Sequence, residues 1–474
     1  MCSSVPGSLL PLVVERRTPL FGWAVAAVVV AFLWGSQATG LVSSNDGSHL
    51  ALARALVLRG ETRIDAEVAL TLSVDVAGRG GHAYSDRPPG AAFLALPAVW
   101  LGAQLDAPLL ALSRRLGRLV VPPACGAYAR TYVARADDPL PLRELMGTAW
   151  AVTLHSVLVG LSGLVVLGML LTRLGITARS LTISLAVAAA ATLWGPYATT
   201  LFSHATAALF VSIVLWGCHA LGQRPVQRRV AVLTGAAAAW AVATDYLLVV
   251  PMVGVVAWTV PTRYWALLIA GGLPIVVATL AYHSVAFGSP WALGYHFQQR
   301  FAFARGVGST FSGNPLAGLA TLLGPIRGAG LWWQAPVLLV AWVGCSRAPS
   351  CVRRWCLAFL PWLLLLAWHR TPWGGAGSDH RYLVPSLPLW IILFGLGIQR
   401  IRGTKREGIW MLGVAGLGLW SAWRVWAHFL DWHATTAFGA PMQGLTLALA
   451  VAMLATGLAL LASRHPHADE KETT

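Results

Sequence analysis

The chain has 474 residues, of which 57% are hydrophobic and only 11% are charged, and its formal net charge is +16. An ordinary soluble domain carries about 25% charged residues, so this composition excludes a soluble enzyme, and the high hydrophobic content excludes a disordered chain. The apolar runs are long and continuous rather than alternating with polar residues, which favours membrane-spanning helices over a membrane barrel of strands.

Nearly all of the positive charge comes from arginine, since Lys405 and Lys471 are the only lysines. Most arginines stand in short loops between apolar runs, which is the pattern of cytoplasmic loops in membrane proteins. We therefore interpret the charge as a topology signal and exclude nucleic acid as a partner. The six cysteines are scattered without paired CxxC spacing, so neither a disulfide framework nor a zinc site is predicted.

Twelve apolar runs predict an all-α polytopic membrane protein, with 1–474 as a single membrane domain. In chain order the runs are 20–40, 146–172, 179–199, 203–222, 229–245, 246–260, 264–285, 331–346, 354–368, 382–398, 407–428 and 441–462. Twelve spans place the arginine-rich loops and both termini in the cytoplasm, with 463–474 as a cytoplasmic tail. The opposite side receives 41–145 and 286–330 as two large outer loops. The sequence therefore predicts a multi-pass protein of the plasma (inner) membrane, surrounded by membrane lipids, with an extracytoplasmic site.

The first outer loop, 41–145, holds ten of the 18 acidic residues of the chain. They are Asp46, Glu61, Asp65, Glu67, Asp75, Asp86, Asp106, Asp137, Asp138 and Glu144. For most of them we expect a solvated loop. The apolar stretch 91–105 has only 15 residues, which is short for a bilayer, so it is predicted to be a juxtamembrane helix on the outer surface.

The sequence N-D-G-S-H, residues 45–49, directly follows the first predicted span. A carboxylate at the membrane face costs free energy unless it is paired, bound to a ligand or used in chemistry, which points to a functional role for Asp46. Asp46 also fits the N-cap of a short amphipathic helix, because leucines follow at positions 50, 52, 56 and 58. The two roles do not exclude each other.

A second distinctive run is Y-S-D-R-P-P-G, residues 84–90. Two prolines favour an extended backbone, so Asp86 and Arg87 are predicted to lie in a stiff turn at the membrane surface. A carboxylate there can bind a metal ion, and a guanidinium can bind a phosphate. The alternative is a local ion pair at a helix start, with Pro88 or Pro89 in the first turn.

Together these features resemble the GT-C superfamily of polyprenyl-phosphate-dependent glycosyltransferases, which includes protein O-mannosyltransferases and the bacterial aminoarabinose transferases that modify lipid A. The similar features are an Asp after the first span, a polar amphipathic outer loop, and an aromatic-x-acid-base-Pro-Pro run before a juxtamembrane helix. Aminoarabinose-type relatives have Tyr-x-Glu/Asp-Lys-Pro-Pro at that place. The segments R-G-A-G-L-W-W-Q-A-P (327–336) and G-S-D-H-R-Y-L-V-P-S-L-P (377–388) also look similar. The likeness covers most of the chain in architecture but only short motifs in residues.

The resemblance implies a role for each matching residue. Asp46 matches the acid proposed as catalytic base or as organiser of the acceptor and a metal. Asp86 matches a metal-binding acid of the site, Arg87 matches the lysine that meets the lipid phosphate, and Tyr84 matches the preceding aromatic residue. The chain departs from the family pattern at one place. Relatives often have Arg-Tyr three and four residues after the first acid, whereas this chain has His49 and Leu50 there.

Further candidates lie elsewhere on the outer side. Arg381, in the run Asp379-His380-Arg381, is a candidate second phosphate-binding residue, or else part of an interfacial anchor. His204 is a candidate metal ligand beside the two acids, or else a hydrogen-bonded structural histidine. Trp373 is a candidate for stacking on a sugar, or else a member of the interfacial aromatic belt. The expected substrate-binding residues are Tyr84, His49, His380 and Trp373, and the expected metal set is Asp46, Asp86 and His204.

The sequence thus predicts an integral membrane glycosyltransferase that moves a sugar from a polyprenyl-phosphate donor to a lipid, protein or cell-wall acceptor. The cofactor considered for it is a divalent metal ion, whose identity the sequence does not specify. Such a transfer needs a carboxylate near the acceptor hydroxyl and positive charge at the departing phosphate. Two alternatives stay open, a transporter or lipid flippase and a non-catalytic subunit of the same fold. A transporter should show repeats and charges at mid-bilayer, whereas the ionisable groups of this chain gather at one face.

Overall fold

The computed structural model describes residues 20–37, 43–115, 145–223, 227–328, 330–374, 379–402 and 404–433. The α-helices are α1 (Leu20–Gln37), α2 (Ser44–Arg59), α3 (Gly90–Arg115), α5 (Met146–Arg173), α6 (Ala178–Ala190), α7 (Trp194–Tyr197), α8 (Ser203–Leu221), α9 (Arg228–Thr244), α10 (Val249–Thr259), α11 (Trp265–Phe287), α12 (Val307–Thr310), α13 (Pro315–Leu323), α14 (Leu331–Gln334), α15 (Ala341–Cys345), α16 (Ser350–Trp368), α17 (Leu387–Ile401) and α18 (Glu407–His433). Short 3-10 helices are η1 (Asp65–Thr71), η3 (Tyr246–Leu248), η4 (Thr262–Tyr264), η5 (Gly294–Phe297), η6 (Ala302–Arg305), η7 (Ile326–Gly328), η8 (Pro336–Val340) and η10 (Arg381–Ser386). The protein is therefore a helical membrane protein with many spans, as its composition predicts.

Most of the predicted spans appear as helices, although some are broken. Six helical stretches are long and apolar enough to cross a membrane: Gly90–Leu112, Met146–Arg173, Ser203–Leu221, Thr262–Phe287, Ser350–Trp368 and Arg381–Ile401. The run 179–199 divides into α6 and α7 near Pro196, and the run 331–346 divides into α14, η8 and α15 at Pro336, since proline interrupts the backbone hydrogen bonds of a helix. The predicted span 441–462 and the tail 463–474 lie outside the described residues.

The helix predicted at 91–105 is longer than expected. The helix α3 runs for 26 residues, and its first 23 are long and apolar enough to cross a membrane. It packs along α5, where Gly102 allows close approach because an added Cβ would lie 2.5 Å from the Cα of Thr148. Arg54 of α2 contacts Asp106 of α3 at 3.5 Å and Thr148 at 3.1 Å. These contacts fasten α3 between α2 and α5, so a 15-residue surface helix was too short a description.

A two-stranded hairpin interrupts the otherwise helical outer region. The strands β1 (Val76–Arg79) and β2 (His82–Ser85) pair antiparallel and are joined by Gly80 and Gly81. Both glycines have positive φ angles, 60° and 81°, which a tight hairpin turn needs and which glycine adopts without strain. The prediction of an all-α protein missed this hairpin, since four-residue strands give little periodic signal.

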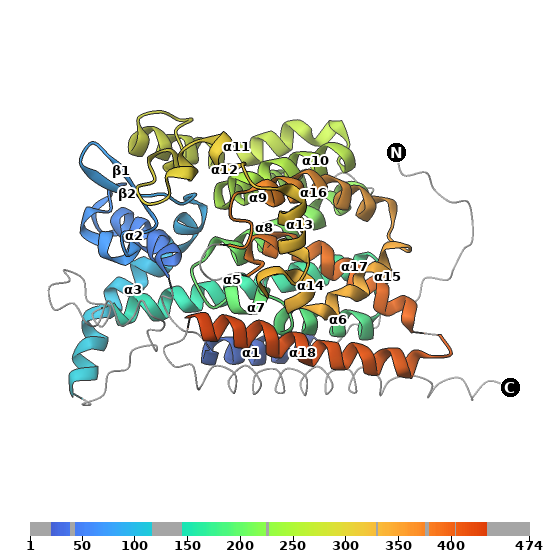
Figure 1. The fold of residues 1–474 in the computed structure, drawn as a ribbon. Helices are drawn as coiled ribbons and strands as arrows, with labels where there is room; N and C mark the ends of the chain where they lie inside the picture. Colours follow the sequence, from blue (N-terminus) through green and yellow to red (C-terminus); the bar gives the residue numbers. More distant parts are fainter. Residues whose placement is uncertain are drawn as a thin grey trace.

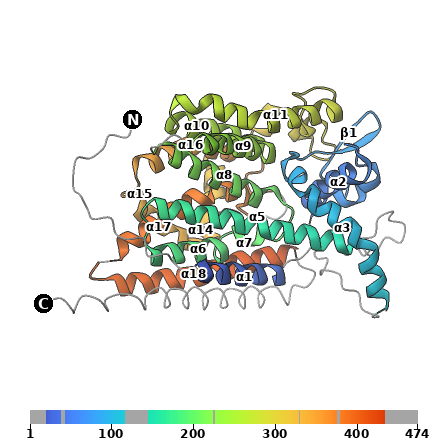
Figure 2. The same cartoon turned by 180° about the vertical axis from the view of Figure 1, so that it is seen from behind.

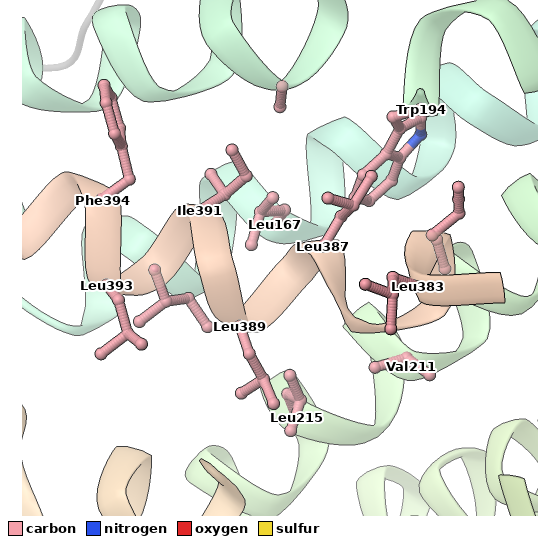
Figure 3. Packing of buried hydrophobic residues seen from close by; sticks show 14 of the residues in the cluster. Leu167, Trp194, Val211, Leu215, Leu383, Leu387, Leu389, Ile391, Leu393 and Phe394 are labelled. Carbon is pink, nitrogen blue, oxygen red and sulfur yellow. The ribbon is translucent and has the colours of Figure 1, made fainter. Parts of the chain in front are cut away.

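The main core lies among the long helices. Figure 3 shows side chains of α17 packed between α5 and α8: Leu387 lies by Trp194 and Leu167, and Leu389 lies by Leu215. A second, smaller cluster of buried apolar residues lies under α2, the hairpin and the start of α3. The described part of the outer region, residues 43–115, therefore folds with its own packing rather than as a solvated loop. The predicted loop residues Asp137, Asp138 and Glu144 lie outside the described residues.

The outer elements gather at one end of the helical bundle. In Figures 1 and 2, α2 and the hairpin lie at the end opposite to the turn that joins α17 to α18. The arginine-rich stretch 400–406 is part of that turn. The acidic elements α2 and the hairpin and this basic turn thus lie at opposite ends of the bundle, which agrees with the separation of acidic and basic segments in the sequence. The helices α1 and α18 run along the same face of the bundle in both views.

Candidate functional site

The start of α2 places Asp46 inside the protein. Ser43, not Asp46, is the N-cap residue, and it forms a capping box with Asp46 in the third helical position. The Asp46 carboxylate accepts hydrogen bonds from the Ser43 backbone N–H at 2.8 Å and from the Ser43 hydroxyl at 3.1 Å. The N-cap expected at Asp46 therefore lies three residues earlier, at Ser43. The Asp46 carboxylate is fully buried.

The turn after β2 brings Asp86 and Arg87 against a third charged residue. Asp86 is 2% exposed, and its Oδ1 lies 3.4 Å from Arg87 Nε. Arg87 Nη2 donates a hydrogen bond to Asp75, which directly precedes the hairpin. Asp75 also accepts a hydrogen bond from the Ser44 hydroxyl at 2.5 Å. The predicted ion pair of neighbouring residues is thus part of a buried network that reaches the first residue of α2.

The environment of Asp86 favours its protonated form. Burial is the main cause that raises the pKa of Asp86 to about 7, while Arg87 lowers it and the Asp75 carboxylate raises it. The second outer loop closes over this residue, because an added Cβ on Gly294 would lie 2.8 Å from the Cα of Asp86. Asp86 therefore titrates near neutral pH, as functional carboxylates often do.

Two buried histidines lie within electrostatic range of the arginines of the site. His49 is fully buried, and burial together with the charge of Arg87 lowers the pKa of its imidazole to about 3. His204 at the start of α8 is within electrostatic range of His49, Arg87 and Arg381. Neither ring nitrogen of either histidine has a hydrogen-bond partner among the described residues. Buried polar atoms normally have partners, so these four ring nitrogens are available to hydrogen-bond a polar ligand.

The segment before α17 supplies a second arginine beside a buried carboxylate. Asp379 is 2% exposed and accepts a hydrogen bond from the Tyr197 hydroxyl at 2.5 Å. Burial alone would raise the pKa of Asp379, but Arg381 and the Tyr197 hydroxyl outweigh it and lower the pKa. The Arg381 guanidinium lies over the Phe202 ring at 5.7 Å, and its Nε has no hydrogen-bond partner among the described residues.

These elements converge although they are far apart in the sequence. Tyr382 lies within electrostatic range of both Arg87 and Arg381, and its ring centroid is 6.0 Å from that of His204. The site therefore combines the start of α2, the turn after β2, the start of α8 and η10. Of the predicted residues, the structure gathers His49, Asp86, Arg87, His204 and Arg381 in one electrostatic cluster. Asp46 lies one helical turn before His49, on the same face of α2.

Three predicted substrate-binding residues have other neighbours. Tyr84 is 7% exposed and packs against Phe287, with ring centroids 5.7 Å apart, in the outer core. Trp373 lies under the Arg327 guanidinium at 4.0 Å, and Arg327 has a positive φ of 57°, which is strained for a residue other than glycine. His380 is fully buried beside Asp379.

The described residues do not fit a metal site. Within the ranges given above, no group of three His, Cys, Asp or Glu side chains is placed so that it could hold a metal ion. The expected ligand set of Asp46, Asp86 and His204 is therefore not assembled among the described residues. No step of the chemistry below is derived through a metal ion.

Sequence reasoning missed three residues that shape the site. Asp75 was expected in a solvated loop but is 4% exposed and bonded to Arg87. Tyr197 bonds to Asp379 across 182 positions of sequence. Gln298 of the second outer loop donates to the Val74 carbonyl at 2.7 Å. Each contact depends on long-range packing, and no local pattern marks these residues.

Comparison with known proteins supports the fold. No protein-family model and no curated protein sequence matches this chain. Two crystal structures of ArnT from Cupriavidus metallidurans have a similar fold. The structure bound to undecaprenyl phosphate has a TM-score of 0.52 at 21% identity, and the match covers 93% of this chain and 76% of that chain. The apo structure has a TM-score of 0.52 at 19% identity, covering 94% and 76%. The resemblance stated from the sequence motifs is confirmed for the fold.

Proposed function

We propose that this protein is a membrane glycosyltransferase that transfers a sugar from a polyprenyl-phosphate donor to an extracytoplasmic acceptor. The observation that carries the proposal is the convergence of Arg87 and Arg381 on two unpartnered buried histidines. The fold is shared with an ArnT structure that is bound to undecaprenyl phosphate, which supports a lipid phosphate as the ligand. The charge pattern supports an outward-facing site and cytoplasmic termini.

The side chains of the site suit the steps of such a transfer. The bond between the sugar C1 and the phosphate oxygen breaks, and the acceptor oxygen forms the new bond to C1. Asp46 would take the proton of the acceptor hydroxyl. Arg87 and Arg381 would stabilise the negative charge that grows on the departing polyprenyl phosphate. His49 and His204 would donate hydrogen bonds to the same head group as neutral imidazoles.

Binding of a phosphate-bearing lipid tests this proposal directly. Purified full-length protein in detergent should bind undecaprenyl phosphate, whereas undecaprenol without the phosphate should bind much more weakly. Arg87→Ala and Arg381→Ala should each weaken binding by about tenfold or more, because each removes a charge-assisted hydrogen-bond donor. Arg79→Ala is the matched control, since Arg79 lies on β1 and contacts the Ala286 carbonyl. Equal affinity for the two lipids would contradict the proposal.

The proposed donor role of Arg87 has a kinetic consequence. Arg87→Ala should raise the KM for the polyprenyl-phosphate sugar more than the KM for the acceptor, because Arg87 lies on the proposed phosphate side of the site. Steady-state transfer with varied donor and then varied acceptor measures the two constants. Equal effects on both constants would argue against a phosphate-binding role.

A further inference from the structure

Asp75 is a buried carboxylate that joins two parts of the site. One of its oxygens accepts the hydrogen bond from Arg87 Nη2, and the other accepts the Ser44 hydroxyl at 2.5 Å. Ser44 is the first residue of α2 and stands two residues before Asp46. A single carboxylate therefore links the proposed phosphate-binding guanidinium to the helix that carries the proposed base.

The backbone around Asp75 is held on both sides. The Val74 carbonyl accepts a hydrogen bond from Gln298 Nε2 at 2.7 Å, and the Val76 carbonyl accepts one from the Gln299 backbone N–H at 3.1 Å. Asp75 itself is only 4% exposed. A buried carboxylate with both oxygens bonded, on a backbone fixed by another loop, is a rigid support rather than a mobile counter-ion.

Arg87 lies between two carboxylates but is hydrogen-bonded to one of them. Its Nε is 3.4 Å from Asp86 Oδ1, yet neither of these two atoms has a hydrogen-bond partner among the described residues. The side-chain hydrogen bond to Asp75 is the one that Arg87 makes within that part of the chain. A guanidinium has five N–H donors, so fixing one edge leaves donors for the oxygens of a phosphate.

We propose that Asp75 is a positioning residue that holds Arg87 next to α2 and keeps its guanidinium from closing onto Asp86. The proposal rests on the proposed function, in which Arg87 binds the lipid phosphate. Without the Asp75 charge, Arg87 would turn to the nearby Asp86 carboxylate and would be withdrawn from the phosphate. The effect to expect is therefore weaker lipid binding, even though one negative charge has been removed from the site.

The same change should alter the titration of Asp86. Burial raises the pKa of Asp86 to about 7, with Arg87 lowering it and Asp75 raising it. Loss of Asp75 removes a repulsion and gives Asp86 a hydrogen bond from Arg87, so both changes lower the pKa. The other titratable groups that face Asp86 are the phenols of Tyr246, Tyr282 and Tyr295, which stay neutral between about pH 5 and 9.

The test compares undecaprenyl phosphate binding by wild-type protein, Asp75→Asn, Arg87→Ala and the double variant. Asp75→Asn should weaken binding about tenfold, and it should cause no further loss in the Arg87→Ala background, because the proposed effect passes through Arg87. In wild-type protein, ionisation of Asp86 should weaken binding with a midpoint near pH 7, and Asp75→Asn should move that midpoint to lower pH. The titration of the lipid phosphate itself is common to all variants.

The matched control is Asp65→Asn, at an exposed carboxylate of the same region that bonds to His82 at 2.9 Å. It should leave both the affinity and the midpoint unchanged. If Asp75→Asn does not fold, Ser44→Ala removes one of the two bonds of Asp75 and should weaken lipid binding about threefold, on the scale of one modest hydrogen bond.

The outcomes separate this inference from the proposed function. Wild-type affinity or tighter binding in Asp75→Asn, or an equal further loss in the Arg87→Ala background, would overturn the positioning role while leaving the lipid-binding function intact. Failure of wild-type protein to bind undecaprenyl phosphate would overturn the proposed function and, with it, the role of Asp75.

Discussion

Asp46 has a structural role and a proposed catalytic role, and substitutions can separate the two. Its carboxylate completes the capping box with Ser43, and we propose that it also acts as the base. A capping interaction contributes about 1 kcal/mol to the free energy of unfolding, whereas a positioned general base contributes about 100-fold or more to the rate. The cap alone therefore cannot account for a complete loss of transfer.

Asp46→Asn should abolish sugar transfer while the protein still folds, inserts into the membrane and binds undecaprenyl phosphate. Ser43→Ala is the control, because it removes the cap hydroxyl and keeps the carboxylate, so it should lower stability by about 1 kcal/mol and leave most of the transfer activity. Transfer assays and thermal unfolding of both variants measure the two effects. Full activity in Asp46→Asn would remove Asp46 from the mechanism.

Asp86 links the site to the pH dependence of stability. Its pKa in the folded protein is about 7, above the ordinary value of 3.8. Between these values the folded protein holds a proton that the unfolded chain has released, so stability falls as pH rises from about 4 to about 7. Stability falls because the ionised Asp86 carboxylate is a buried charge, and Arg87 compensates the cost of its burial only in part.

Asp86→Asn should remove this fall in stability, and its unfolding temperature at pH 8 should exceed that of the wild-type protein. Thermal unfolding in detergent between pH 4 and pH 8 measures the slope. Asp65→Asn serves as the comparison variant, and in it the fall in stability above pH 4 should persist. The reason is that hydrogen bonds to Ala83 and His82 outweigh burial and lower the pKa of Asp65, so Asp65 does not cause a fall in that range. An unchanged slope in Asp86→Asn would show that Asp86 does not titrate in this range.

The second outer loop acts as a packing element that closes one side of the site. The helix η5 approaches the backbone of Asp86. Gln298 donates a hydrogen bond to the Val74 carbonyl, before Asp75, and the Gln299 backbone N–H donates one to Val76, on the strand that follows Asp75. Further along, Arg370 N–H bonds to the Thr310 carbonyl at 2.9 Å. The loop thus connects the hairpin side of the site to the segment that precedes η10.

Gly294→Ala tests this packing, because the new Cβ would have to lie 2.8 Å from the Cα of Asp86 and the backbone must shift. We expect undecaprenyl phosphate binding to weaken by about tenfold, with a loss of about 1–3 kcal/mol in stability. Gly308→Ala is the matched control in the same loop, since nothing lies within 4 Å of its Cβ position. Wild-type binding in Gly294→Ala would mean that the loop does not define the site.

The arrangement of the bundle makes a prediction about membrane orientation. The outer elements and the turn between α17 and α18 lie at opposite ends of the molecule. The arginines of the inner loops should keep that end in the cytoplasm.

Single cysteines introduced into a cysteine-free background report this orientation. Gly308→Cys should react with a membrane-impermeant maleimide added to intact cells, whereas Lys405→Cys should react only after the membrane is opened. Both positions are exposed, so access to the reagent depends on sidedness. The reverse pattern would invert the proposed topology and place the site in the cytoplasm.

The sequence by itself determined the membrane class, the position of most spans and the orientation signal, because hydropathy and arginine placement are local properties that folding does not change. It also marked Asp46 by its position directly after the first predicted span, and Asp86 and Arg87 through a short motif whose prolines restrict the backbone. Only the tertiary structure decided that α3 is long and that Asp75 is a buried partner of Arg87. It also showed that Arg381 joins the same site across nearly 300 positions of sequence. These outcomes depend on which helices and loops pack together, and packing between distant segments leaves no periodic signal in either segment alone.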